Sequence, residues 1–326
     1  MDGQPTAREG RAVGGNKPAR VLDVTVLMGG PSSEREISLI SGSGIADALE
    51  RLKYRVTRAD ISPSDTSALD RKCIDVVFIA LHGDFGESGE VQAMCESRAL
   101  RYTGSSPHAS QLAMDKAASK QMFKRAGLNT PEWMIIEEFH SPARFKKWLP
   151  ELSLPVVVKP VDGGSSIDIT IARDTDQRDE ALDTLIDKYG RAMLEQYVPG
   201  RELTVGVLGA EALPVIEIVP SRDFYDYVAK YADDSGTRFV FDHGLSDQQV
   251  KEIQAAAMQA HQCLGCRDMS RVDFVMDASG AFQVLEINTI PGFTSHSLLP
   301  MAAAKAGISF DQLVERLVRM ALQRQA

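Results

Sequence analysis

The chain has 326 residues, a formal net charge of −9, 44% hydrophobic residues and 25% charged residues. This length allows two or three domains with buried cores, and the composition is that of an ordinary globular protein. The acidic balance disfavours nucleic acid and anionic membranes as partners. The longest apolar runs, such as 76–81, are too short to cross a bilayer.

The first twenty residues and the cysteine content both indicate a cytoplasmic protein. Residues 1–20 are polar, glycine-rich and basic, without the apolar core of a signal peptide, so we expect a disordered tail. Four cysteines in a chain of this length do not form a disulfide framework, and the single CxxC pair lacks the second pair that a zinc site needs.

From residue 21 onward, segments typical of strands and helices alternate. The expected strands are 21–27, 55–61 and 75–81, and the expected helices are 34–52 and 91–100. This βαβ order predicts a parallel sheet that binds ligands at the carboxyl ends of its strands. Two glycine-rich loops, 29–33 and 82–86, follow such strand ends.

Two further units follow, so the fold class is α/β with three α/β domains. The second combines a helix at 114–126 with strands at 155–159 and 167–172 around a glycine–serine loop. The third has longer strands, a helix at 246–263 and a hairpin. We place the boundaries near 107 and 199, which gives domains at 21–107, 108–198 and 199–326.

The hairpin 271–288 is the segment most indicative of chemistry. A four-residue turn would pair Arg271 with Glu286 and Asp273 with Val284. Alternation then gathers four polar side chains on one face: Arg271, Asp273, Glu286 and Asn288. Carboxylate and amide oxygens suit magnesium, and an arginine suits a carboxylate or an oxyanion. A solvated polar strand face closed by a salt bridge explains the same spacing equally well.

Three lysines, Lys116, Lys159 and Lys230, lie near turns or strand ends. Lys159 precedes the loop 162–166, whose glycines and serines could surround a phosphate group. Neither the P-loop nor the dinucleotide-binding motif is present. Without further evidence, each lysine is as well explained as an ordinary surface residue.

Glu34 and His82 follow the first and third predicted strands. Ser33 is predicted to cap the helix that contains Glu34, with Glu36 completing a capping box. A favourable interaction of Glu34 with the helix dipole is a sufficient explanation of its position. His82 ends a buried strand, where it could meet a ligand or simply hydrogen-bond within its loop. No GxSxG motif supports a serine hydrolase.

These motifs, in this order, resemble the D-alanine–D-alanine ligase family of the ATP-grasp superfamily, from about residue 24 to about residue 317. The motifs that carry the resemblance are Gly29-Gly30-Pro-Ser-Ser-Glu34, Ala80-Leu81-His82-Gly83, Tyr102-Thr-Gly104-Ser, Met114-Asp115-Lys116, Val158-Lys159-Pro160, Gly164-Ser165-Ser166, Lys230-Tyr231, Arg271-Val-Asp273, Glu286-Ile-Asn288 and Pro291-Gly292-Phe-Thr294-Ser-His296-Ser297-Leu298. The resemblance implies a Rossmann-like N-terminal domain followed by a two-domain ATP-grasp.

The resemblance also implies how the cofactors are held. The ATP-binding residues would be Lys116, Lys159, Lys230 and the Ser165–Ser166 loop at the phosphates, Glu195 and the Val198 backbone at adenine, and Glu202 at the ribose. Two magnesium ions, replaceable by manganese, would be bound by Asp273, Glu286 and Asn288.

The implied activity is the ATP-dependent joining of two D-alanine molecules, through a D-alanyl phosphate, for peptidoglycan synthesis. The substrate and catalytic contacts would be Glu34 at the ammonium of the first D-alanine with His82 close by, a hydrogen-bonded triad of Glu34, Ser165 and Tyr231, Arg271 and the Gly292 N–H at the tetrahedral intermediate, and Ser297 with the Leu298 N–H at the second carboxylate. Family members are commonly homodimers, so a homodimer is expected.

Two alternatives remain from the sequence. A related ATP-grasp ligase could use a different second substrate and make a depsipeptide or another dipeptide, although Tyr231 after Lys230 is typical of members that form dipeptides. A nucleotide-binding pseudo-ligase is favoured only by Asp168, which replaces a glycine usual in the family. Because Ile167 and Ile169 flank it, strand alternation predicts that Asp168 faces solvent, Lys230 or Arg238.

Overall fold

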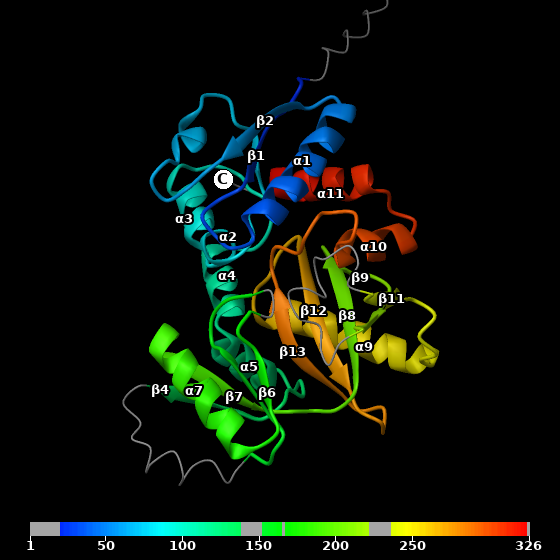
Figure 1. Cartoon of the computed structure of the whole chain (residues 1–326). Coiled ribbons are helices and arrows are strands. Elements are labelled where there is room, and N and C mark those ends of the chain that lie inside the picture. The colour runs from blue at the N-terminus through cyan, green and yellow to red at the C-terminus, as the bar shows by residue number, and fades with distance from the viewer. Residues whose placement is uncertain (1–19, 138–151, 165–166, 222–235, 325–326) are drawn as a thin grey trace, which may run out of the picture.

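The computed structural model describes residues 20–137, 152–164, 167–221 and 236–324, and their strands form three sheets (Figure 1). The first sheet is parallel and the other two are antiparallel. Across these ranges, no helix is long and apolar enough to cross a membrane.

The first sheet has the predicted parallel arrangement. Its strands, in the order β2–β1–β3, are β1 (Asp23–Met28), β2 (Arg55–Asp60) and β3 (Val76–Ile79). The associated helices are α1 (Arg35–Arg51), the short 3₁₀ turn η1 (Ser67–Asp70), α2 (Asp84–Glu87) and α3 (Glu90–Ser97). All four residues of β3 are buried although it is last in the strand order, because Tyr102 pairs beside it and the last described helix packs against it. The glycine-rich loops at 29–33 and 82–86 therefore lie at the same edge of the sheet.

The end of the chain packs against this first sheet. Helix α11 (Phe310–Gln323) lies beside α1 and follows α10 (Leu298–Lys305) (Figure 1). Its apolar residues recur at helical spacing and are buried in the same core as β1 and β3. Beyond α11, Arg324 forms an ion pair with buried Asp268, and this pair joins the chain end to the start of β12.

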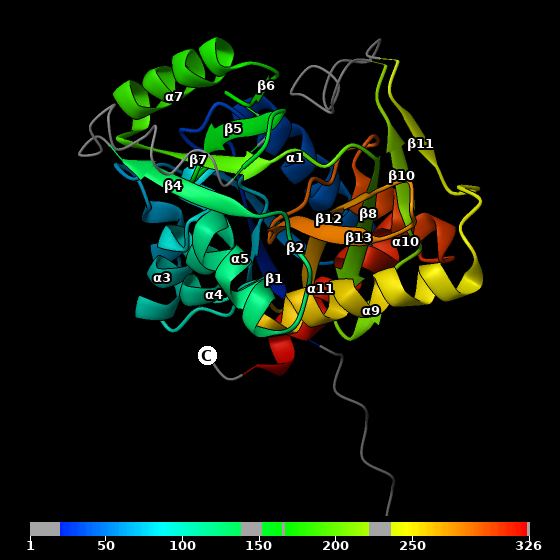
Figure 2. The same ribbon diagram turned by 90° about the horizontal axis from the view of Figure 1, so that it is seen from below.

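The second sheet has the strand order β4–β7–β5–β6. Its strands are β4 (Trp133–Glu137), β5 (Val156–Pro160), β6 (Thr170–Ala172) and β7 (Arg191–Gln196). Helix α7 (Thr175–Tyr189) packs on one face, capped by Asp174 and ended by Gly190 at φ +73° (Figure 2). Before the sheet come α4 (Pro107–Met114) and α5 (Lys116–Arg125), capped by Ser106 and Asp115.

The third sheet has the strand order β11–β10–β8–β12–β13, with β9 beside β8. Its strands are β8 (Arg201–Leu208), β9 (Glu211–Ala212), β10 (Ile216–Val219), β11 (Arg238–Val240), β12 (Met269–Met276) and β13 (Phe282–Asn288). Helix α9 (Asp247–Cys263) covers one face, and a capping box of Ser246 and Gln249 begins it. The other face turns toward the second sheet (Figure 2).

The register predicted for the β12–β13 hairpin was wrong. Arg271 pairs with Asn288, and Asp273 pairs with Glu286. The Asp277 carboxylate accepts the Ala281 N–H and lengthens the loop to five residues, which shifts the pairing by one position. A bulge after Asp273 shifts it by one more. Because two single shifts restore the side-chain alternation, the polar residues still share one face, as predicted.

Candidate active site

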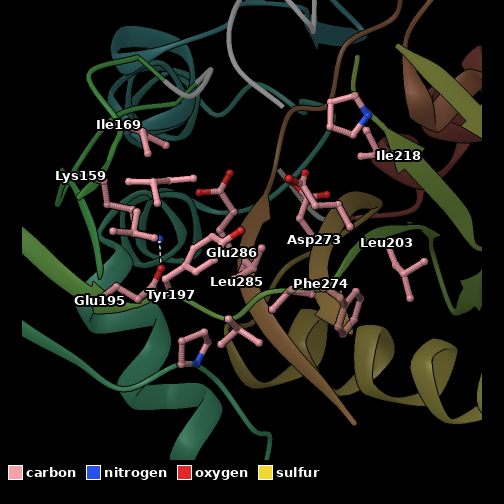
Figure 3. Close-up of a pocket in the computed structure, with 18 of the residues that line it drawn as sticks. Lys159, Ile169, Glu195, Tyr197, Leu203, Ile218, Asp273, Phe274, Leu285 and Glu286 are labelled. Atoms are coloured by element: carbon pink, nitrogen blue, oxygen red, sulfur yellow. Dashed lines mark hydrogen bonds and ion pairs between the residues drawn. The ribbon is translucent and has the colours of Figure 1, made fainter. Parts of the chain in front are cut away.

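A cavity of about 320 Å³ lies between the second and third sheets (Figure 3). Its apolar walls come from both sheets: Val157, Ile169 and Ile171 on one side, and Leu203, Phe274 and Leu285 on the other. Lys159 and Glu195 lie at one end of the cavity. Glu286 and Asp273, which belong to the β12–β13 hairpin, lie further along it (Figure 3). Such a slot suits a flat aromatic ring, with charged groups available at its ends.

Two residues of the predicted polar face of the hairpin, Asp273 and Glu286, line this cavity, and Asn288 lines a smaller cavity beside it. Asp273 accepts two hydrogen bonds from the Arg271 guanidinium, at 2.9 and 2.7 Å, and one from the Thr204 hydroxyl at 2.6 Å. Glu286 lies opposite Asp273 across the strand pair. Two carboxylates and the amide oxygen of Asn288 make a hard oxygen donor set that fits magnesium. The Arg271 guanidinium offsets part of the negative charge of Asp273.

Lys116 brings the glycine–serine loop to this face. It is the first residue of α5, and its ammonium donates to the Gly163 carbonyl at 2.5 Å. The same ammonium lies 3.9 Å from a carboxylate oxygen of Glu286. A second, smaller cavity of about 30 Å³ lies between these groups and Glu87 of the first unit. A phosphate group placed here would meet a lysine, glycine N–H groups and the proposed metal ligands together.

Glu195 is the most constrained acidic residue of the cavity. It is buried on β7, and its carboxylate pairs with Lys159 on β5 at 2.7 Å and with Lys120 on α5. Burial by itself would raise the pKa of Glu195, but the charges of Lys159 and Lys120 outweigh burial and hold it below its usual value. Glu195 is therefore ionised and can only accept hydrogen bonds.

Glu34 reaches the site from the first unit. It is buried at the start of α1, and a Cβ placed on Gly164 would lie 3.8 Å from its carboxylate. The predicted Ser33 cap was wrong, because the Glu34 N–H instead donates to Ser32 Oγ at 3.2 Å. Ser32 also donates to the His82 carbonyl at 2.6 Å, so it joins the two glycine-rich loops.

His82 is enclosed by protein groups. Its Nδ1–H donates to the Ile290 carbonyl at 3.1 Å, and Nε2 lies 3.3 Å from Ser41 Oγ. Ser41 in turn accepts the Phe293 N–H. Both ring nitrogens are thus engaged, which favours the interpretation of His82 as a hydrogen-bonded loop histidine. Its position fixes the segment before Gly292 against α1.

Gly292 and Ser297 meet at the N-terminus of α10. A Cβ on Gly292 would lie 2.5 Å from Ser297 Oγ, so no larger residue fits without movement. Ser297 Oγ accepts the Thr294 N–H at 2.9 Å and lies 2.9 Å from Thr294 Oγ1. Ser297 is the N-cap of α10, which begins at Leu298. Helix N-termini favour anions, so this turn suits a carboxylate.

Asp168 lies away from the cavity, as predicted, but for a different reason. Strand β6 begins only at Thr170, so strand alternation does not apply. Asp168 has φ +58°, a conformation that glycine adopts easily and aspartate tolerates. Its carboxylate accepts from Lys188 at 2.6 Å and Tyr189 at 2.5 Å. The predicted partner Arg238 is therefore replaced by residues at the end of α7.

Some residues around the site were not predicted from the sequence, and four predicted residues lie outside the part of the chain that the structure describes. Ser165, Ser166, Lys230 and Tyr231 lie outside the described residues. The missed residues are Glu87, Lys120 and Thr204. Burial raises the pKa of Glu87, and the Glu34 carboxylate contributes to this rise, while the contact with His82 opposes it. Nothing in the sequence around Lys120 or Thr204 distinguishes them from ordinary helix and strand residues.

Comparisons with known proteins identify the family of the chain. Residues 122–319 match the family model described as D-ala D-ala ligase C-terminus, and residues 59–105 match its N-terminus. The D-alanine–D-alanine ligase of Gloeobacter violaceus is 43% identical over 302 residues, covering 92% of this chain and all of the relative.

Solved structures of ligases have a similar fold. The D-alanine–D-alanine ligase of Bacillus anthracis complexed with ATP has a TM-score of 0.82 and 32% identity, covering 94% of this chain and 98% of that chain. The VanG D-Ala:D-Ser ligase of Enterococcus faecalis has a TM-score of 0.82 and 27% identity, covering 93% of this chain and 100% of that chain.

Proposed function

The chain belongs to the D-alanine–D-alanine ligase family, and on this basis we propose that it joins two D-alanine molecules at the expense of ATP. The reaction proceeds through a D-alanyl phosphate and supplies a precursor of peptidoglycan. The observation that carries the proposal is the inter-sheet cavity, which combines apolar walls with Lys159 and Glu195 at one end and Asp273 and Glu286 at the other.

ATP occupies this cavity in the proposed complex. The adenine ring lies between the apolar walls, beside Glu195 and the Val198 backbone, and Glu202 holds the ribose. Lys116, Lys159 and Lys230, together with Ser165 and Ser166, contact the phosphates. Asp273, Glu286 and Asn288 would hold two magnesium ions, which would neutralise negative charge at the transferred phosphoryl group.

The residues around the cavity fit the chemistry of peptide formation. An amine does not attack a carboxylate readily, because the carboxylate oxygen is a poor leaving group. Phosphoryl transfer from ATP to the carboxylate of the first D-alanine makes that oxygen part of a phosphate leaving group. The amine of the second D-alanine then attacks the carbonyl carbon and displaces phosphate. Glu34 holds the first ammonium with His82 nearby, and Arg271 and the Gly292 N–H stabilise the tetrahedral intermediate by donating hydrogen bonds to its oxyanion. Glu34, Ser165 and Tyr231 form the proposed triad.

The second D-alanine binds with its carboxylate at Ser297 and the Leu298 N–H. This position uses the N-terminus of α10, where the helix dipole favours an anion. The VanG D-Ala:D-Ser ligase has a similar fold, and by its name it uses D-serine, so proteins of this fold differ in their second substrate. A depsipeptide-forming or other dipeptide-forming ligase is therefore the second candidate function.

We also propose the cellular and quaternary setting of the enzyme. The protein acts in the cytoplasm as a homodimer, without nucleic-acid or membrane partners. Its first domain, 21–107, contributes substrate contacts, and domains 108–198 and 199–326 enclose ATP.

A coupled assay tests the proposed function. ADP, phosphate and D-alanyl-D-alanine should form only with magnesium and D-alanine, and D-lactate, D-serine and L-alanine should react poorly. Equal turnover with L-alanine would contradict the stereochemistry. Faster turnover with D-lactate or D-serine would favour the second candidate, and absence of phosphate release by folded protein would leave a pseudo-ligase.

Replacing Asp168 with glycine should change the KM for ATP by less than about threefold. The Asp168 carboxylate is paired with Lys188, and an exposed ion pair contributes only about 0–1 kcal/mol. Glycine also relieves the positive φ at this position. Steady-state kinetics with varied ATP measures the effect. A tenfold fall in KM would show that the carboxylate meets the phosphates, and a tenfold rise would show that it stabilises the ATP-bound form.

A further inference from the structure

Lys120 is a buried charge that the proposed mechanism does not use. Its side chain is 0% exposed, lower than that of any other charged residue in the described ranges. Its ammonium donates to Thr130 Oγ1 at 2.6 Å and to the Pro131 carbonyl at 3.3 Å, and it pairs with Glu195 Oε1. Burying an ammonium costs several kcal/mol unless its partners compensate for the lost water. Such a charge therefore calls for a specific role.

The partner of Lys120 is the acidic residue of the proposed adenine site. Lys159 pairs with Glu195 Oε2 at 2.7 Å, so the two carboxylate oxygens are held by two different lysines. Lys159 comes from β5 and Lys120 from α5, and together they fix the carboxylate from two sides. Burial lowers the pKa of Lys120 to about 8, and the Glu195 charge opposes this decrease. Lys120 is thus charged at neutral pH and reinforces the ionised state of Glu195.

An ionised carboxylate discriminates between ligand groups that donate hydrogen bonds and groups that only accept them. It accepts hydrogen bonds and cannot donate them, so it favours the 6-amino group of adenine and disfavours the 6-oxo group of hypoxanthine or guanine. We propose that Lys120 is a positioning residue that keeps Glu195 ionised and oriented toward the purine, and that it thereby sets the preference for 6-aminopurine nucleotides. This inference rests on the proposed function only in placing ATP in the inter-sheet cavity.

The test compares ATP with inosine triphosphate, which differs from ATP at purine position 6 and the adjacent N1 proton. Lys120→Met keeps a side chain of similar length but removes the charge. We expect the Kd for ATP to rise about tenfold while the Kd for inosine triphosphate changes less than about threefold. The kcat should remain within about threefold of wild type, because the purine edge is remote from the reacting groups.

Lys124→Met is the matched control. Lys124 lies one turn further along α5, over the same Trp133 ring, at 4.9 Å from its centroid compared with 5.4 Å for Lys120. It is exposed and pairs with Glu132 rather than Glu195. Its replacement removes the same charge from the same helix and should leave the preference between the two nucleotides unchanged.

A double-mutant cycle separates positioning from general structural support. If Lys120 acts through Glu195, Lys120→Met should cause no further loss of nucleotide preference in a Glu195→Gln background. Lys120→Gln serves if the Met variant fails to fold, because its amide can still donate to Thr130 while the charge is lost. It should lose the preference as Lys120→Met does.

Calorimetric binding without D-alanine keeps this inference separate from the ligase assignment. Loss of preference in either Lys120 variant supports the role of Lys120 even if D-alanine proves not to be the substrate. An unchanged preference in a folded variant overturns it. An equal loss of affinity for both nucleotides also overturns it, because it would show that Lys120 only supports the fold.

Discussion

Replacing Glu286 with glutamine should lower kcat by about a hundredfold or more, a loss of roughly 3 kcal/mol in transition-state stabilisation. Glutamine keeps the size of the side chain but removes one negative charge from the face that we propose binds magnesium. Glu286 lies opposite Asp273 and 3.9 Å from the Lys116 ammonium, where the transferred phosphoryl group would be neutralised. The change therefore acts at the proposed reacting centre. Single-turnover phosphate release at saturating ATP measures it.

Stability and charge controls decide whether such a loss is specific. Glu286 faces a cavity and is only partly buried, so the free energy of unfolding in urea should remain close to that of wild type. Glu211→Gln makes the same change at an exposed position of the same sheet and should leave kcat unaltered. The proposed metal role would be rejected if the Glu286 variant, with magnesium in excess, kept turnover within about threefold of wild type.

The sequence predicted the fold class because its strongest patterns are periodic. Alternating apolar strands and amphipathic helices after residue 21 predicted the parallel sheet and the loops at its carboxyl edge. Features that depend on a single residue were not predictable in this way. The register of the β12–β13 hairpin depends on the Asp277 side chain and on a bulge, and neither leaves a periodic pattern. The polar residues still share one face because the two shifts add to two residues, which is one full period of side-chain alternation.

The site was predicted where residues occur in motifs, and missed where burial arises from packing between distant segments. Lys159 and Glu195 are neighbours because β5 pairs with β7. Lys159 was named from a family motif, and Glu195 from the adenine contact that the resemblance implies. Lys120 resembles any helical lysine in the sequence, and only the tertiary structure, in which its ammonium meets Glu195 of β7, makes it a buried partner of that carboxylate. Asp168 was placed correctly by an incorrect argument, since its positive φ cannot be derived from alternation.

Replacing Gly292 with alanine should lower kcat/KM for D-alanine by about thirtyfold, which corresponds to roughly 2 kcal/mol. The added Cβ would lie 2.5 Å from Ser297 Oγ, closer than real Cβ contacts allow. Ser297 must then give up its contacts with Thr294, and the N-terminus of α10 shifts with it. Because this turn is the proposed site of the second carboxylate, the loss should appear in the KM for D-alanine. The Kd for ATP should stay within about twofold, since neither residue lines the inter-sheet cavity.

Two further variants identify the cause of that loss. Gly44→Ala adds the same methyl group inside α1, where the nearest atom would be 3.8 Å away, and should retain wild-type kinetics. Ser297→Ala removes the hydroxyl that the methyl group added at Gly292 would otherwise meet. If the clash is the cause, Gly292→Ala should add little further loss in the Ser297→Ala background. Fully additive losses would instead mean that Gly292 acts independently of Ser297, by the position of its own N–H at the tetrahedral intermediate.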